Sequence, residues 1–230
     1  MLREIIDKYY LDSNKSWEQT RFYISQAGKC PRSIFFKFKK VPEKPLEANL
    51  LRIFDHGNHM HQLIMSALIS SRDVHVVASE VKIPPQELVS GRADAVLSDG
   101  NQLYVLDIKS MDSRTFDNMT EPKIENVQQI QLYLYYFKIP KGILLYVNKD
   151  NLQLKEYIFD YDLEEAQRLI KEMTLLRTQI DTDVVPKRID AYPNNGECKY
   201  CQYKSVCDIA VPEEIKWERL KLQIDFRGEK

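Results

Sequence analysis

Several features are scarce in this 230-residue sequence, and each shortage excludes a class of protein. No segment approaches the roughly eighteen uninterrupted apolar residues that a membrane-spanning helix needs, so we expect no membrane partner. The first residues carry acidic side chains and lack the apolar core of a secretory signal, which indicates a cytoplasmic protein. Only seven glycines occur, and no flexible linker or low-complexity tract is present. A formal net charge of −1 confines any basic patch to a local groove.

Cysteine is also scarce, but its spacing is informative. Cys30 stands alone near the start, whereas Cys198, Cys201 and Cys207 lie close together near the end. Free thiols are expected in a reducing compartment, so disulfides are the weaker interpretation. A C-x-x-C pair followed closely by a third cysteine is typical of a metal or cluster site rather than of core packing.

The hydrophobic pattern predicts a mixed α/β protein with helices flanking a central sheet. Apolar residues recur at helical spacing over the first seventy positions, and the pattern then changes to short β-branched segments. The remaining elements are predicted as strands at 73–84, 88–98, 102–110 and within 142–161, helices at 123–139 and 163–180, and a closing polar helix from about Pro212.

This pattern predicts a single domain over residues 1–230. We divide it into a helical part over about 1–72, a core over 73–182, and a cysteine-bearing segment with a tail helix over 183–230.

Two acidic residues and a lysine fall on neighbouring predicted strands. Asp107 and Lys109 are two apart on one strand, so they project from the same side of it. If this strand pairs with the preceding one as a hairpin, Asp94 lies beside Asp107, and two carboxylates there would bind Mg²⁺ or Mn²⁺. The lysine could orient the attacking water and offset charge on a phosphate. A solvated D-x-K on a strand is common, but the apolar setting LYVLDIKSM favours a functional role.

Three histidines lie on the predicted helix that precedes these strands. His59 and His61 are two apart, so they cannot share one helix face and at most one of them points at the site. We favour His61, which lies at helical spacing from Phe54 and Gly57, and interpret His56 and His59 as structural or exposed.

The predicted helix over 123–139 carries glutamines and tyrosines at helical spacing. Gln129 shares a face with Tyr133, and Gln131 shares a face with Tyr135, so the pattern leaves two candidate pairs. A glutamine on the site-facing side would suit contact with a phosphate or with the lysine.

These residues resemble the ordered motifs of the RecB-type PD-(D/E)XK nucleases. The cysteines are similar to those of the iron–sulfur branch of that family, which includes the CRISPR-associated RecB-type exonucleases (the fourth Cas family), their phage or archaeal stand-alone relatives, and the nuclease domains of AddB-like and Dna-two-like helicases. The resemblance runs over about 30–207. Each motif alone is weak, but five in order with a split cysteine set are specific. The matching positions are Cys30-Pro31-Arg32, His61, Gly91–Asp94, Asp107–Lys109, Gln129-x-x-x-Tyr133 and Cys198-x-x-Cys201-x5-Cys207.

The resemblance implies a restriction-endonuclease-like fold and a role for each matched residue. His61, Asp94 and Asp107 would be metal ligands, with the carbonyl of Ile108 as another, and Asp107 is an aspartate where many relatives have glutamate. Lys109 would be the catalytic lysine. Gln129 and Tyr133 would position DNA or the lysine, and Glu80 would have a supporting role.

The resemblance further implies a [4Fe-4S] cluster held by Cys30, Cys198, Cys201 and Cys207, which would join the two ends of the chain. Structural Zn²⁺ is the alternative, since four thiolates suit either group. The implied activity is a Mg²⁺- or Mn²⁺-dependent DNA exonuclease acting on single strands or free ends, in CRISPR adaptation, phage recombination or repair.

Two alternatives of other classes are a non-catalytic DNA-end-binding scaffold and a zinc-stapled interaction protein. No G-x-x-x-x-G-K-[ST] motif occurs, so a partner nuclease, integrase or helicase would supply the DNA ends.

Overall fold

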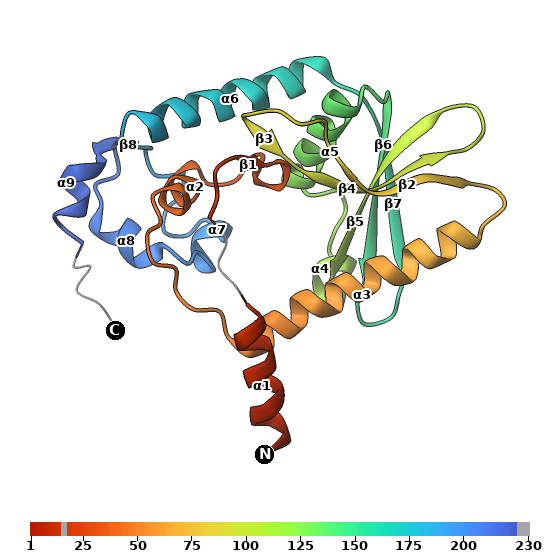
Figure 1. Ribbon diagram of the computed structural model, residues 1–230, viewed down its shortest axis with the longest axis horizontal. Coiled ribbons are helices and arrows are strands. Elements are labelled where there is room, and N and C mark those ends of the chain that lie inside the picture. Colours follow the sequence, from red (N-terminus) through yellow and green to blue (C-terminus); the bar gives the residue numbers. More distant parts are fainter. Residues whose placement is uncertain (15–17, 225–230) are drawn as a thin grey trace.

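The computed structural model describes residues 1–14 and 18–224 (Figure 1). Most predicted helices and strands are confirmed within a few residues. In chain order the elements are α1 (Leu2–Ser13), β1 (Phe22–Tyr23), the short 3-10 helix η1 (Ile24–Gln26), α2 (Pro31–Phe38), α3 (Ala48–Ser70), β2 (His75–Lys82), β3 (Val89–Ser90), β4 (Arg92–Ser98), β5 (Leu103–Met111), α4 (Ser113–Asp117), α5 (Ile124–Phe137), β6 (Lys141–Asn148), β7 (Leu154–Asp160), α6 (Leu163–Asp181), β8 (Val184–Val185), α7 (Gly196–Lys199), α8 (Lys204–Ile209), β9 (Ile215–Lys216) and α9 (Trp217–Lys221).

A mixed five-stranded sheet forms the centre, with strand order β2-β4-β5-β6-β7. Strands β2, β4 and β5 form an antiparallel meander, β6 runs parallel to β5, and β7 returns antiparallel to β6. The parallel pair needs a crossover connection, and α5 provides it. The expected hairpin of β4 and β5 is confirmed, with Ala95 opposite Leu106.

Helices cover both faces of the sheet. Ile130 and Leu134 of α5 pack with Leu144 on one face, within the large core that also receives α6. On the other face, one side of α3 packs against a smaller apolar cluster that includes Leu106 and Ile108. Gly142 permits the close approach of α5, because a Cβ there would lie 2.5 Å from Ile130 Cγ1. This is the α/β sheet flanked by helices that the sequence predicts.

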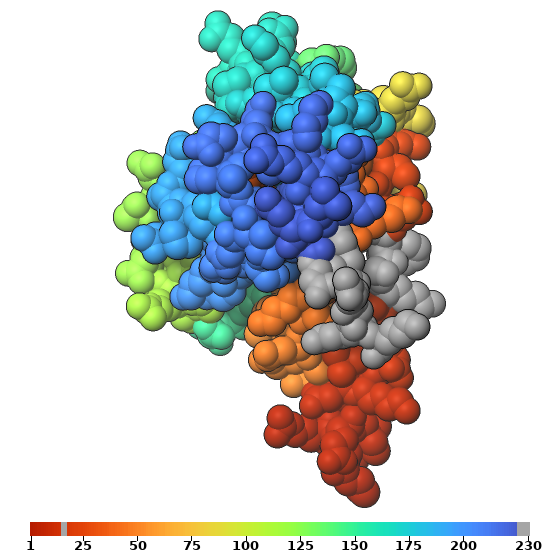
Figure 2. All heavy atoms as spheres, turned by 90° about the vertical axis from the view of Figure 1, so that its left-hand side faces the viewer, coloured from red at the N-terminus to blue at the C-terminus, as the bar shows by residue number. Residues whose placement is uncertain are grey.

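The two ends of the chain meet beside the sheet. Helix α2 lies next to the C-terminal segment in Figure 1, and Figure 2 shows that segment as one continuous blue surface. Phe35 and Phe36 of α2 pack against Trp217, with ring centroids 5.9 and 6.3 Å apart, and Phe36 also meets Tyr203 at 5.9 Å. An aromatic core therefore joins segments separated by more than half of the sequence.

Several elements differ from the sequence-based expectations. The closing helix, α9, begins after the short strand β9 rather than at about Pro212, and α4 was not predicted. Helix α1 projects from the body (Figures 1 and 2), and it joins α3 through the ion pair of Asp7 with Arg52 and a hydrogen bond from Tyr10 to Asp55. Residues 225–230 of the expected tail lie outside the described residues. None of the helices described here combines the length and the apolarity needed to cross a bilayer.

Candidate active site and four-cysteine cavity

The two predicted carboxylates meet where β4 and β5 pair. Asp94 Oδ2 accepts a hydrogen bond of 2.6 Å from the backbone N–H of Ile108, so the side chain of β4 reaches across to the backbone of β5. Asp107 precedes Ile108 on β5 and is only 4% exposed. Its neighbours Leu106 and Ile108 point to the other face of the sheet, and Gln129 of α5 contacts the carboxylate of Asp107 on its own face.

The carboxylate of Asp107 and the ammonium of Lys109 form a buried ion pair. Lys109 Nζ lies 2.8 Å from Asp107 Oδ2, in a direction that does not make an aligned hydrogen bond, so this oxygen is a buried acceptor without a hydrogen-bond donor among the described residues. Burial raises the pKa of Asp107 and the nearby Asp94 raises it further, while the charge of Lys109 opposes both effects. Such an acceptor is suited to a cation.

Helix α3 brings one histidine to the carboxylates. His61 Nδ1 lies 3.2 Å from Asp94 Oδ1, and the imidazole is partly exposed. His59 instead faces solvent and binds the carbonyl of Asp55 in its own helix, and His56 is exposed. The structure therefore places His61, and not its neighbours, beside the acidic pair.

Gly57 was not recognised as part of the site from the sequence. A Cβ at Gly57 would lie 3.2 Å from Ser110 Oγ, next in sequence to Lys109. The glycine lets α3 approach the end of β5 closely, one helical turn before His61. An isolated glycine in a strongly helical segment is the signal that could have indicated this contact.

Helix α5 supplies a glutamine that links the lysine to the buried carboxylate. Lys109 Nζ donates to Gln129 Oε1 at 2.8 Å, and Gln129 Nε2 donates to Asp107 Oδ1 at 3.2 Å. The hydroxyl of Tyr133 donates to the carbonyl of Arg92 at 2.7 Å, and burial raises the pKa of Tyr133 above its ordinary range. Gln129 and Tyr133 thus lie at the site.

The second candidate pair on α5 lies elsewhere. Gln131 donates to the carbonyl of Asp160 and accepts from the N–H of Asp162, which ties α5 to the end of β7. Tyr135 packs its ring against Tyr136. The tertiary structure therefore resolves the choice that the helical spacing left open.

Glu80 contributes indirectly. It lies on β2 with a φ of 53° and forms a 2.6 Å ion pair with Arg92, two residues before Asp94. Its side chain is more than half exposed and is directed to Arg92 rather than to Asp107 or Lys109. Its contact is with the strand that carries Asp94.

The donor set at the acidic pair suits a hard divalent cation, because carboxylate oxygens and one imidazole nitrogen are ligands that Mg²⁺ or Mn²⁺ accepts. Across residues 1–14 and 18–224, no three His, Cys, Asp or Glu side chains are already arranged closely enough to hold a metal ion. Asp94 is engaged by Ile108 and His61, and Asp107 by Lys109 and Gln129. The buried Asp107 oxygen without a donor indicates that the residues fit such an ion.

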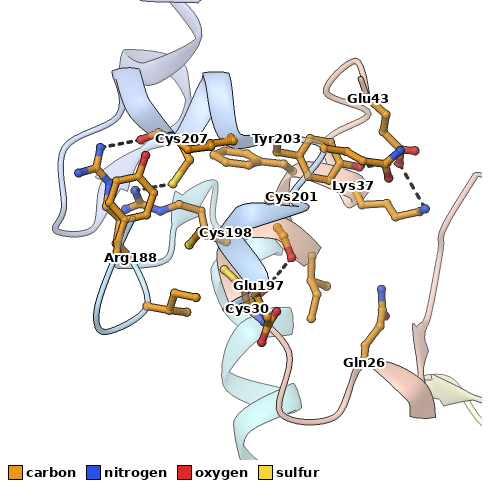
Figure 3. Close-up of a pocket in the computed structure, with 18 residues that line it drawn as sticks. Gln26, Cys30, Lys37, Glu43, Arg188, Glu197, Cys198, Cys201, Tyr203 and Cys207 are labelled. Carbon is orange, nitrogen blue, oxygen red and sulfur yellow. Dashed lines mark hydrogen bonds and ion pairs between the residues drawn. The ribbon is translucent and has the colours of Figure 1, made fainter. Parts of the chain in front are cut away.

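All four cysteines line one cavity of about 270 Å³ (Figure 3). Cys30 comes from the start of α2, Cys198 from α7, Cys207 from α8, and Cys201 from the segment between them. All four are free thiols. Burial raises the pKa of the Cys30 thiol to about 11 and also raises the pKa of Cys198 and Cys201. The thiols of Cys30, Cys198 and Cys201 therefore lack the lowered pKa of reactive cysteines.

Three lysines in and just after α2 are each paired with a carboxylate and so do not form a free basic surface. Lys37 pairs with Glu43, Lys39 with Asp183, and Lys40 with Glu18. Lys149 differs from these: its ammonium donates to the carbonyl of Ile53 on α3 at 3.2 Å, and no carboxylate among the described residues lies within ion-pair distance.

This arrangement of a β-hairpin carrying two acids and a lysine, covered by α3 and α5, defines a nuclease core. The chain belongs to the PD-(D/E)XK nuclease superfamily, whose family model matches residues 61–208. The sequence is similar to the CRISPR-associated exonuclease Cas4 of Saccharolobus solfataricus, with 27% identity over 222 residues that cover 90% of this chain and 98% of that protein. The resemblance to this family is thereby confirmed.

Solved structures show the same fold. The crystal structure of SSO0001 is 25% identical, with a TM-score of 0.59 over 90% of this chain and 96% of the other. The alkaline exonuclease LHK-Exo of Laribacter hongkongensis, solved in complex with dAMP, has a TM-score of 0.54 and 14% identity, over 90% of this chain and 100% of the other.

Proposed function

We propose that this protein is a divalent-metal-dependent DNA exonuclease that hydrolyses phosphodiester bonds in single strands or at free ends. The observation that carries the proposal is the buried network in which Gln129 connects Lys109 to Asp107 beside Asp94. An isolated surface D-x-K would not be buried, and would not be positioned by a glutamine from another element. The family membership and the similarity to a CRISPR-associated exonuclease support a nuclease.

His61, Asp94, Asp107 and the carbonyl of Ile108 would hold Mg²⁺ or Mn²⁺. When bound, such an ion supplies Lewis-acid chemistry by polarising a phosphoryl oxygen and lowering the pKa of a bound water. Asp107 is buried, so its carboxylate lies in a setting of low dielectric constant. There its attraction to a divalent cation would be stronger than it is at the solvent-exposed surface.

Lys109 would be the catalytic lysine. Its ammonium can orient the attacking water and offset the charge that develops on the phosphate. Gln129 is a positioning residue, since it fixes Nζ at 2.8 Å through Oε1. Tyr133 supports the start of β4 through the Arg92 carbonyl, and Glu80 supports the same residue through its ion pair.

Cys30, Cys198, Cys201 and Cys207 would hold a structural [4Fe-4S] cluster that joins the two ends of the chain. The observation that supports this proposal is that all four thiols line one cavity of about 270 Å³. A structural Zn²⁺ is the alternative, since four thiolates suit either group.

The proposed setting is cytoplasmic, with the whole chain acting as a single nuclease domain in CRISPR adaptation, phage recombination or repair. The 27% identity to a CRISPR-associated exonuclease supports the first of these settings. DNA with free ends would be supplied by a partner integrase, helicase or second nuclease, because the sequence carries no motif for nucleotide-driven unwinding.

The deciding experiment follows end-labelled single-stranded DNA with Mn²⁺ or Mg²⁺, comparing wild type with Asp107→Ala and Lys109→Ala. Stepwise shortening by the wild type alone, with DNA binding retained by Lys109→Ala, supports the exonuclease and gives its polarity. If the wild type binds DNA ends but cuts neither single strands, duplexes nor flaps, the catalytic proposal is wrong and an end-binding scaffold replaces it. Zinc without visible absorbance would replace the cluster by a zinc site.

A further inference from the structure

One arginine near the cysteine cavity is buried without a carboxylate partner. Arg32, in the first turn of α2, is only 1% exposed. Its Nε donates to the carbonyl of Pro186 at 2.8 Å, and one terminal nitrogen donates to the carbonyls of Pro212 and Glu213 at 3.2 and 3.0 Å. The other terminal nitrogen lies 3.7 Å from Cys207 Sγ. No carboxylate in the described part of the chain lies within ion-pair distance of this guanidinium.

A fully buried guanidinium requires a compensating charge. Carbonyl oxygens satisfy its N–H groups but carry no net charge, and an uncompensated buried ion is strongly unfavourable. Among the hydrogen-bond partners of Arg32 in the described residues, the sulfur of Cys207 is the one atom that can carry a full negative charge. The contact therefore places the buried guanidinium charge against one of the four sulfurs that line the cysteine cavity.

A second guanidinium lines the same cavity. Arg188 donates to the carbonyls of Cys207 and Asp208, at 2.6 and 3.2 Å, and stacks over the ring of Tyr192 at 4.2 Å. Its Nε is buried and has no hydrogen-bond partner among the described residues. This buried donor lies in the wall that also carries the four thiols, as the position of Arg188 in Figure 3 shows.

The other charged side chains of the cavity largely neutralise one another. Lys37 pairs with Glu43 at 3.2 Å, and Lys204 pairs with Asp208 at 2.8 Å. Glu197 accepts the N–H of Cys30 at 2.9 Å, and its carboxylate offsets one further positive charge. With Arg32 and Arg188 included, the wall keeps a small excess of positive charge.

We propose that Arg32 and Arg188 form a guanidinium cradle that balances the negative charge of a four-thiolate metal group and sets how firmly it is held and how easily it is reduced. Four thiolates around Zn²⁺, or around an iron–sulfur core of charge 2+, leave an anionic group, so both arginines stabilise it. Both are positioning residues, and the inference rests on the proposed metal site at the cysteines. It does not require the chain to cut DNA.

Positive charge near an iron–sulfur group favours the state with the added electron, so the cradle raises the reduction potential. The test purifies the full chain without oxygen and titrates it with dithionite while the visible absorbance is followed. Iron and sulfide per chain are measured in parallel. Arg188→Gln removes the charge, Arg188→Lys keeps it, and Arg177→Gln on α6, which binds Asp181 and lies outside the cavity, is the matched control.

We expect Arg188→Gln to lower the equilibrium constant for reduction about tenfold, which corresponds to a midpoint potential lower by about 59 mV for one electron. Arg188→Lys should stay near the wild type, and Arg177→Gln should not change. Arg32→Gln and Arg32→Lys repeat the comparison at the more buried site, with circular dichroism to verify folding. If a variant at one arginine does not fold, the glutamine and lysine variants at the other arginine still show whether the midpoint potential depends on the positive charge.

Equal potentials in wild type and Arg188→Gln at full iron content would overturn the cradle, as would equal shifts in the glutamine and lysine variants. If the wild type contains zinc, the readout becomes the rate of zinc release to a chelator. Faster release from Arg188→Gln than from Arg188→Lys would then retain the cradle and reject the cluster. A wild-type protein that contains neither iron nor zinc would overturn both the cradle and the metal site at the cysteines. Loss of nuclease activity enters none of these outcomes, so failure of the exonuclease proposal remains distinguishable.

Discussion

Two buried glutamines on α5 allow the proposed role of Gln129 to be tested against a matched control. Gln129 and Gln131 are 6% and 4% exposed, and apart from a longer 3.4 Å bond from Gln129 to the Tyr133 hydroxyl each makes two side-chain hydrogen bonds. Those of Gln129 join Lys109 to Asp107, whereas those of Gln131 go to the backbone at the end of β7. Replacement of either glutamine by leucine keeps a similar volume and removes both bonds. The two variants therefore differ in whether the site or only the scaffold is affected.

The expected magnitudes follow from these partners. Hydrogen bonds to charged groups contribute about 1.5–3 kcal/mol each. If the loss of these bonds in Gln129→Leu misplaces Lys109 and raises the activation free energy by about 2 kcal/mol, kcat falls roughly 30-fold. Gln131→Leu leaves backbone groups without partners, which lowers the free energy of unfolding by about 1–3 kcal/mol but leaves kcat unchanged. KM should change little in either variant, because neither side chain lies on an exposed DNA-binding surface.

The assay measures initial rates on end-labelled single-stranded DNA with Mn²⁺ at several substrate concentrations, together with chemical denaturation of each variant. A large loss of kcat confined to Gln129→Leu supports the network. The reasoning is wrong if Gln131→Leu loses as much kcat as Gln129→Leu, or if Gln129→Leu retains the wild-type rate while its fold is intact.

Three further predictions concern stability. Because burial raises the pKa of folded Asp107, its ionised form destabilises the fold, an effect that is absent at acid pH, grows as the pH rises above the ordinary pKa of the unfolded carboxyl and is complete above the folded pKa. Asp107→Asn should therefore raise the melting temperature of chelator-treated protein at about pH 8, with a smaller gain at about pH 5, and equal gains would contradict this. Cys201→Ala should lose the brown colour and much of the folded protein, and a normal yield of stable, colourless protein would refute a structural cluster. Gly142→Ala should lower the free energy of unfolding by about 1–3 kcal/mol, because its Cβ would lie 2.5 Å from Ile130 Cγ1, and an unchanged denaturation midpoint would show that α5 can shift freely.

Local sequence patterns predicted a large part of the fold. The two-residue period of a strand places Asp107 and Lys109 on one side, and the apolar neighbours of Asp107 indicate its burial. The closing helix was misplaced because β9 forms only by pairing with β8, a contact between segments that no local pattern reveals.

The candidate site was predicted less completely. The i,i+2 rule separated His61 from His59, since those positions point in different directions on any helix. The same rule could not choose between Gln129 and Gln131, because both faces of α5 are covered and each glutamine finds a buried partner. The missed Gly57 contact depends on the distance between α3 and β5, which is a property of packing.

The sequence by itself determined most of the helices and strands, the family motifs and the placement of Asp107 and Lys109 on one side of a strand, because each depends on residues close together along the chain. Tertiary structure decided that Cys30 and Cys198 line one cavity, that Lys39 pairs with Asp183, and that Arg32 is buried against Cys207. Those contacts join residues more than a hundred positions apart in several cases, and such contacts are set by how the layers pack and which charges that packing encloses.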